Sequence, residues 1–476
     1  MRSIPPYSGQ PALTHSSARM CADVSRRRPQ PHAGSGISRR GLLGSGMKTI
    51  GLTMIQGSVL YSASGLDEAR RFLREEQAKA AKGRPGFPYA NRENVTEQSL
   101  SRLMTQRQYV PTGDPNMVRR GVLHFDRRQE EERIRRSGEL VRRVEPGPFE
   151  DPGYFAFLAY EAASFEMTAL PQEGWGGFSR FLLGTVHTAS VNAFSQQSEA
   201  DGYWVVLLNS GFIDFVYQSA KAVIEALHPV RSVDNKSFVQ ANTDPQKIRA
   251  ELKVNDAPAN RVYRTLESYF FGGYPRAFTN ETPLEEHIPP LESLVSMAER
   301  WTLAHEYGHG LALDLDFRKA PNPSWAEEFF ADGQATILTV LSALSLDGVP
   351  PEVPLSGGVF TLACLNLVRR AYSIVTTGQD SQDSGSATHP PYKRRAEQNV
   401  TVFRHYFDVQ YKDGGRAGLD WQFKLRKNLP AEDTFVREHR EGVYVFANVL
   451  FDIWPAVKQR LAEQFKAKRP LHEMWR

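Results

Sequence analysis

The chain has 476 residues, of which 41% are hydrophobic and 24% charged, with 58 basic residues against 54 acidic ones. The first 65 residues hold eight of the basic residues and one acid, so residues 66–476 carry 50 basic and 53 acidic side chains, a net charge of −3. This body has no basic excess to suggest nucleic-acid binding, so no nucleic-acid partner is expected. Cys21 and Cys364 are the only cysteines, so a cysteine-based zinc site is excluded as well.

Residues 1–65 form a basic leader. The segment Ser38-Arg39-Arg40-Gly41-Leu42-Leu43 is similar to a twin-arginine export signal, and a mildly apolar stretch follows it. This resemblance predicts export to the periplasm or the extracellular space, with membrane contact only if the leader stays uncleaved. A disordered basic tail on a cytoplasmic protein and a mitochondrial presequence fit the same composition.

Residues 66–150 are highly charged, and helices are expected at 66–81, 97–105 and 127–144. From 151 to 476 the apolar content rises, and about 325 residues are enough for one large domain with its own core. The C-terminal run 443–465 is amphipathic and is expected to pack on that core. The basic tail 466–476 is expected to be loose.

No stretch after residue 65 reaches the roughly 18 uninterrupted apolar residues that a spanning helix needs. The run 355–368 is apolar, but Arg369 and Arg370 follow it directly. We therefore expect a buried helix at this position and no transmembrane body.

The most informative stretch is His305-Glu306-Tyr307-Gly308-His309, at the end of a predicted helix that begins near Pro289. Two histidines four residues apart lie on one helical face and can bind one Zn²⁺ together. Glu306 stands beside the first ligand and can accept a proton from a water whose pKa zinc lowers from about 15.7 to about 7. The alternative is a core helix whose histidines are merely hydrogen-bonded.

A catalytic zinc site with two histidines needs a third protein ligand and leaves its fourth position open. The next predicted helix offers Glu327 and Glu328. Ser324 followed by Glu327 has the pattern of a capping box, which leaves Glu328 as the predicted ligand. Asp332 lies one turn further on the same face, where it is predicted to accept the free ring N–H of a zinc-bound histidine.

The two motifs together resemble the glutamate-zincins, metallopeptidases whose third zinc ligand is a glutamate on a following helix. The segment Thr388-His389-Pro390-Pro391, with Arg395 four residues on, resembles the T-H-P-P-x-x-x-R segment of HtpX and CAAX prenyl-protease type peptidases. Asn192-Ala193-Phe194 and the apolar strand that follows resemble further segments of that group. The matches fall in the same order along residues 190–400.

The resemblance implies an α+β, zincin-like domain, mostly helical, with a small mixed sheet whose edge strand binds substrate. The strand at 202–208 would be that edge, against which a peptide pairs through its backbone. His389 would donate to the developing oxyanion or occupy the zinc position when it is empty, and Arg395 would hold that loop or the substrate carbonyl. Residues 213–290 intervene where the family has a short connection, so this insert is expected to be a lid or a substrate-selecting subdomain.

The sequence thus predicts a peptidase that holds one Zn²⁺ per chain and acts on a peptide or protein substrate, with Glu306 as general base. His305, His309 and Glu328 are the predicted ligands. A zinc-binding scaffold that does not cleave, and a hydrolase of a non-peptide amide, are the alternatives.

Overall fold

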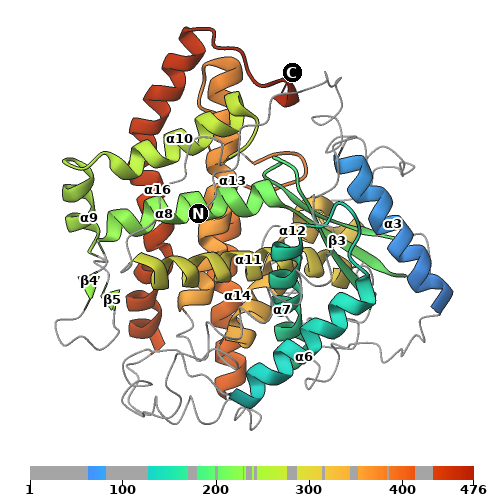
Figure 1. The fold of residues 1–476 in the computed structure, drawn as a ribbon. Coiled ribbons are helices and arrows are strands. Elements are labelled where there is room, and N and C mark those ends of the chain that lie inside the picture. The colour runs from blue at the N-terminus through green and yellow to red at the C-terminus, as the bar shows by residue number, and fades with distance from the viewer. Residues whose placement is uncertain are drawn as a thin grey trace.

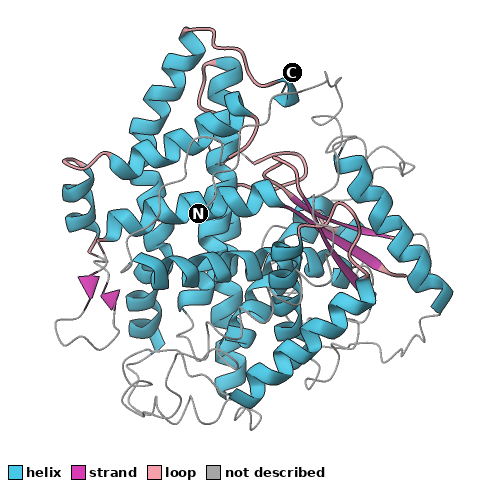
Figure 2. Ribbon diagram, in the orientation of Figure 1, coloured by secondary structure: helices cyan, strands magenta, loops and turns pink. Residues whose placement is uncertain are grey.

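The computed structural model describes residues 63–81, 127–169, 180–198, 202–228, 230–231, 239–240, 244–275, 287–312, 317–343, 352–382, 385–412 and 432–475. The twin-arginine segment at 38–43 and the helix expected at 97–105 lie outside these residues. Within them the chain is mostly helical with a small mixed sheet, so the prediction of an α+β fold is confirmed (Figure 2).

The sheet has the strand order β1-β3-β2. Strand β1 (Phe181–Val186) pairs in parallel with β3 (Trp204–Asn209), and β2 (Ala193–Gln197) pairs antiparallel to β3. The prediction that the strand at 202–208 is the sheet edge is wrong, because β3 lies in the centre and β1 and β2 form the two edges. Every residue of β1 and β3 is buried, whereas β2 is half-buried or exposed. A wholly buried strand needs cover on both faces of the sheet, and helices of the same apolar cluster pack against β1 and β3.

Three helices form the N-terminal part of the described chain: α3 (Ala63–Ala81), α6 (Arg127–Val144) and α7 (Pro152–Ala169). They share an apolar cluster with β1 and β3, at the right of Figure 1. Helix α3 lies close against β1, since a Cβ added at Gly184 would stand 2.7 Å from the side chain of Leu73. The two described helices of the charged region, α3 and α6, therefore contribute directly to the core around the sheet.

One buried carboxylate lies where α3 meets β1. Glu150 is fully buried and accepts hydrogen bonds from the side-chain amide of Gln77 and from the backbone N–H and hydroxyl of Thr185. No ion pair involves it within the described part of the chain. Burial raises the pKa of Glu150 to about 7, and the hydrogen bonds offset only part of that effect.

A second apolar cluster is built from helices. Its main members are α8 (Ser210–Leu227), α10 (Ala257–Gly272), α13 (Glu352–Thr377) and α16 (Glu432–Lys466). Helices α13 and α16 pack against each other along much of their length (Figure 1). Since α8 and α10 arise from the 213–290 insert, two helices of that insert belong to the core of the protein.

Helix α11 (Ile288–Leu311) connects the two clusters. Leu291 and Leu294 in its first turns pack with the helical cluster, whereas Trp301 and Tyr307 pack with the sheet cluster. Its C-terminal turns, which carry the histidine motif, therefore lie against the sheet. The remaining elements are β4 (Val230–Arg231), β5 (Val239–Gln240), α9 (Pro245–Leu252), η5 (Phe317–Lys319), α12 (Pro323–Ser342), α14 (Tyr392–Lys412) and η7 (Glu473–Trp475).

Helix α13 is the one helix among the described residues that is long and apolar enough to cross a membrane, over Val353–Thr377. About two thirds (67%) of its most apolar window is buried inside the protein, as expected for a core helix. The helix expected at 355–368 is present, and it continues past Arg369 and Arg370.

The expectation of a loose tail after α16 is wrong for residues 467–475. The backbone N–H of His472 donates to the carbonyl of Phe270 at 2.8 Å, and the indole of Trp475 packs on Tyr269 and Phe270. Basic composition suggested solvent exposure, but the aromatic residue and the histidine near the end of this segment find partners on α10.

Candidate metal centre

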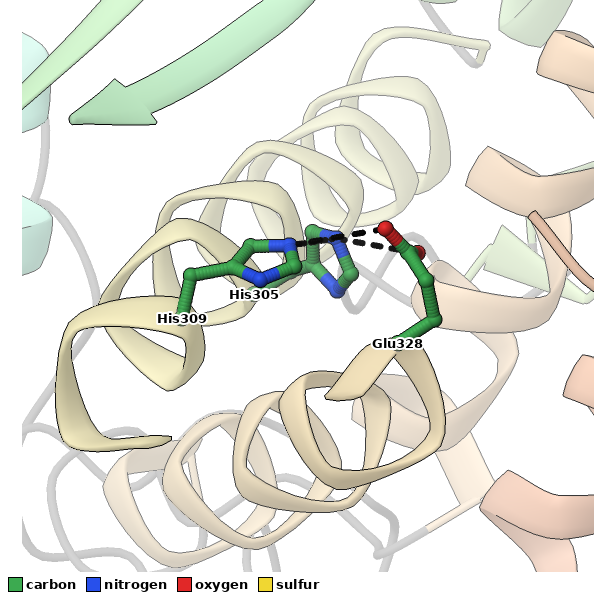
Figure 3. A group of neighbouring side chains, drawn as sticks. All are labelled: His305, His309 and Glu328. Carbon is green, nitrogen blue, oxygen red and sulfur yellow. Dashed lines mark hydrogen bonds and ion pairs between the residues drawn. The ribbon is translucent and has the colours of Figure 1, made fainter. Parts of the chain in front are cut away.

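The two histidines of the motif face the same side of α11, one turn apart. Their Nε2 atoms lie 3.2 Å from each other, and His305 is buried while His309 is half-buried. His305 stacks on Trp301, one turn earlier, at a centroid separation of 5.4 Å. The indole fixes the plane of the first imidazole, and both rings point toward α12 (Figure 3).

Glu328 on α12 completes the group. Its Oε2 lies 3.7 Å from Nε2 of His305, and its Oε1 lies 3.7 Å from Nε2 of His309. One ligand atom from each of the three residues falls within 4.8 Å of the others, and this is the one such group found among the described residues. Burial would raise the pKa of Glu328, but the charges of Arg395 and the neighbouring histidines lower it.

The donor set fits a zinc ion. Two imidazole nitrogens and one carboxylate are the protein ligands of a common catalytic zinc site, which keeps a fourth position open. Oε2 of Glu328 is buried and accepts no hydrogen bond from the described residues, although Arg395 lies 3.1 Å away as an ion pair. A buried oxygen without a donor suits a metal ligand.

Gly308, inside the motif, lets the two helices come close enough to share a metal. A Cβ added at this position would lie 2.6 Å from Cα of Ala331 on α12. Real side chains essentially never approach backbone so closely. Any larger residue would push α12 away from α11, and Glu328 would move with it.

The outer nitrogen of His305 faces Asp332, as predicted. Oδ1 of this fully buried aspartate lies 3.0 Å from Nδ1 of His305. Arg395 on α14 donates to both oxygens of Asp332, at 2.7 and 2.6 Å. Burial would raise the pKa of Asp332, but the charge and hydrogen bonds of Arg395 hold it at about 2, so the carboxylate stays ionised.

The position of Arg395 corrects its expected role. It is buried and its guanidinium is engaged by Asp332 and Glu328, whereas we expected it to hold the loop or a substrate carbonyl. Its planar fork matches the two oxygens of Asp332. It therefore acts as a positioning residue for the ligands.

Glu327 does not form the expected capping box. Asn322 is the N-cap of α12 and accepts a hydrogen bond from the backbone N–H of Trp325, with Pro323 as the first helical residue. Ser324 thus lies inside the helix, and Glu327 is free to contact Nδ1 of His309 at 3.2 Å.

Each candidate ligand histidine thus has a carboxylate behind it. Burial would lower the pKa of His309, but the hydrogen bond to Glu327 and the charges of Glu328 and Glu306 raise it to about 9. Sequence reasoning missed the role of Glu327. The Asn-Pro pair before Ser324 was the signal that could have revealed it, because asparagine is a strong N-cap and proline favours the first helical position.

His389 lies at the exposed side of the group. Its Nε2 is 3.4 Å from Oε1 of Glu328, and its Nδ1 is 2.8 Å from the hydroxyl of Thr388. The loop that carries it is held by Arg369, which donates to the carbonyls of Gln382 and Gly385 at 2.9 and 2.7 Å. His389 therefore lies beside Glu328, and its expected role at the oxyanion stays a prediction.

Glu306 is buried next to the group, and no hydrogen bond or ion pair engages its carboxylate within the described ranges. Its charge contributes to the raised pKa of His309, which places it electrostatically close to the ligands. The edge strand β2 packs against the same helix α11. Glu306 and a strand that pairs on one side only, among the described residues, thus accompany the three candidate ligands.

No protein-family model, no curated protein and no solved structure matches this chain. The argument for function therefore rests on the residues and their geometry.

Proposed function

We propose that the protein is a zinc-dependent peptidase of the glutamate-zincin type. The observation that supports this most is the convergence of His305, His309 and Glu328 within 4.8 Å, from two helices that Gly308 allows to approach closely. Glu306 stands beside the first ligand, as a general base for hydrolysis requires. The three ligands hold one zinc ion per chain.

His305, His309 and Glu328 would hold the zinc ion, which would supply a water with a pKa lowered to about 7 and a Lewis acid for the scissile carbonyl. Glu306 accepts a proton from that water and later delivers it to the leaving amine. Asp332 and Glu327 fix the ring orientation of the two histidines, because each faces the outer ring nitrogen of one of them. Arg395 keeps Asp332 ionised throughout.

His389 donates to the oxygen of the substrate carbonyl as negative charge develops on it. Its exposed position beside Glu328, on a loop that Arg369 holds, leaves its ring accessible to a bound peptide. Strand β2 takes the role expected of residues 202–208, since no described strand pairs with its outer edge, where an extended chain could pair through its backbone. A small amide would leave that ladder unused, which favours a peptide or protein substrate.

Incubation of the zinc-loaded protein with a mixed peptide library, read by mass spectrometry, tests the proposal. We expect the parent to cleave peptides and Glu306→Gln to lower kcat by about 10²–10⁴-fold, the range for loss of a general base. Glu292→Gln is the matched control, because it removes a carboxylate from the same helix outside the site.

Zinc content is measured for all three proteins in parallel. Cleavage that persists in Glu306→Gln would contradict the assigned base. A parent that binds zinc and cleaves no peptide would favour the non-catalytic zinc scaffold instead.

A further inference from the structure

The segment that leads into the edge strand is attached to the junction of β3 and α8. The side chain of Asn209 accepts a hydrogen bond from the hydroxyl of Thr188 at 2.6 Å and donates to the carbonyl of Asn192 at 2.8 Å. The backbone N–H of Gly211 donates to the carbonyl of Thr188 at 2.8 Å. A Cβ at Gly211 would lie 2.5 Å from the backbone of Ala189, so this contact requires glycine.

A further attachment comes from the insert. The backbone N–H of Val191 donates to the hydroxyl of Tyr269 on α10 at 3.0 Å. Both residues are buried, with exposed fractions of 9% and 2%. A buried backbone N–H needs an acceptor, and the tyrosine hydroxyl supplies it two residues before β2 begins.

Tyr269 is in turn covered by residues 467–475. The indole N–H of Trp475 donates to the carbonyl of Tyr269 at 3.1 Å, and the two rings meet edge to face at a centroid separation of 4.8 Å. The ring of His472 fills the space above Gly273, which has a φ of +78°. This segment therefore covers the end of α10 that holds Val191, two residues before the edge strand.

We propose that residues 467–475 position the substrate-binding edge strand through Tyr269. Trp475 and Tyr269 are positioning residues in this arrangement, since neither touches the candidate metal ligands. They fix the backbone of Val191, and with it the start of β2, in the position that an incoming peptide needs for backbone pairing with the strand. The statement about substrate rests on the proposed peptidase function, whereas the coupling between the two segments does not.

Amide hydrogen exchange of the full-length, zinc-loaded protein tests the coupling, because it reports local opening without any need for catalysis. Tyr269→Phe removes one oxygen and keeps the ring. We expect it to increase exchange in residues 187–197 by about tenfold, as for loss of one buried hydrogen bond. Exchange in the motif helix around His305 should stay unchanged, and so should the zinc content.

Two further variants sharpen this test. Tyr263→Phe is the matched control, because it removes a hydroxyl from the same helix that bonds to Glu267 and Gln464 instead of the loop. It should leave exchange at 187–197 as in the parent. Trp475→Phe keeps an aromatic ring but loses the N–H bond to Tyr269, and we expect a smaller increase, on the order of threefold.

Cleavage kinetics then separate positioning from a general loss of structure. On a peptide that the parent cleaves, Tyr269→Phe should raise KM by about tenfold and leave kcat unchanged, since it weakens binding at the edge strand alone. Equal exchange at 187–197 in Tyr269→Phe and Tyr263→Phe would overturn the proposal. If exchange rises but the parent cleaves nothing, the peptidase function fails and the coupling stands.

Discussion

Two carboxylates in this protein are buried to the same extent and differ in charge. Asp332 in the candidate metal centre and Glu150 between α3 and β1 are both fully buried. The pKa of Asp332 is about 2, whereas burial raises that of Glu150 to about 7. Asp332 has Arg395 across from it, and Glu150 has hydrogen-bond donors alone.

The difference shows what keeps a buried group charged. Hydrogen bonds from neutral donors reduce the desolvation effect at Glu150 without cancelling it, whereas a guanidinium reverses it at Asp332. The protein keeps permanent negative charge where it faces a candidate metal ligand. Glu150, by contrast, only joins α3 to β1, and there a protonated carboxyl group is accommodated.

Removal of Arg395 should abolish this contrast, and of the changes proposed in this section it should have the largest effect on stability. Arg395→Met leaves Asp332 and Glu328 without their buried cation, and we expect the free energy of unfolding of the zinc-free protein to fall by about 3–5 kcal/mol. Urea denaturation measures it. The matched control is Arg394→Met, which removes the exposed neighbouring arginine and should change stability little.

A double variant distinguishes the loss of charge compensation from the loss of side-chain packing. Arg395→Met combined with Asp332→Asn removes the charge on both sides of the pair, so part of the lost stability should return. If the double variant is no more stable than the single one, charge compensation is not the reason why Arg395 matters.

The pH dependence of stability should reveal Glu150. Its native pKa of about 7 lies above its ordinary value of 4.5, so the native protein binds more protons than the unfolded chain between these values. The free energy of unfolding should therefore fall as pH rises from about 4.5 through 7, by about 3 kcal/mol in total.

Glu150→Gln should reduce this pH dependence by the part that Glu150 contributes, and Glu397→Gln, which removes an exposed carboxylate on α14, should leave it unchanged. Denaturation curves across this pH range measure both. A parallel slope in all three proteins would assign the pH dependence to another group.

The smallest expected effect is on zinc affinity. It distinguishes Asp332 from Glu327, the two carboxylates that face the outer ring nitrogens of the histidines. Asp332→Asn should lower zinc affinity by about 10–100-fold, as is usual for the outer partner of a ligand histidine. Glu327→Gln should lower it less than about tenfold, because the Glu327 side chain is 47% exposed and solvent weakens its interaction. Competition with a chromophoric chelator measures both, and equal losses would contradict the ranking.

The spacing of the residues in the candidate metal centre follows most directly from the sequence. A four-residue spacing on a helix places His305 and His309 on one face, and one further turn relates Glu328 to Asp332. These are local relations that helix geometry determines. The partners of Arg395 and Glu327 depend on how three helices pack, and local sequence contains no such information.

The sheet edge shows a different kind of failure. Strand order is a tertiary property, and the family resemblance pointed to the wrong strand. A local signal for an exposed strand was present in β2, which ends in Ser195-Gln196-Gln197, whereas β3 is apolar from Trp204 to Leu208. The docking of residues 467–475 depends on the surface of α10, which a basic tail gave no reason to expect.

Gly308 has a consequence for how such motifs are written. The two central positions of His-Glu-x-x-His are conventionally free, yet in this protein the second of them cannot carry a side chain without separating the ligand helices. A mutational scan of the whole chain should therefore find Gly308 as intolerant as the histidines, although it has no chemistry of its own. Searches for other two-helix centres of this design gain selectivity from His-Glu-x-Gly-His followed by Glu-x-x-Ala-Asp, because the glycine and the alanine encode how closely the helices approach.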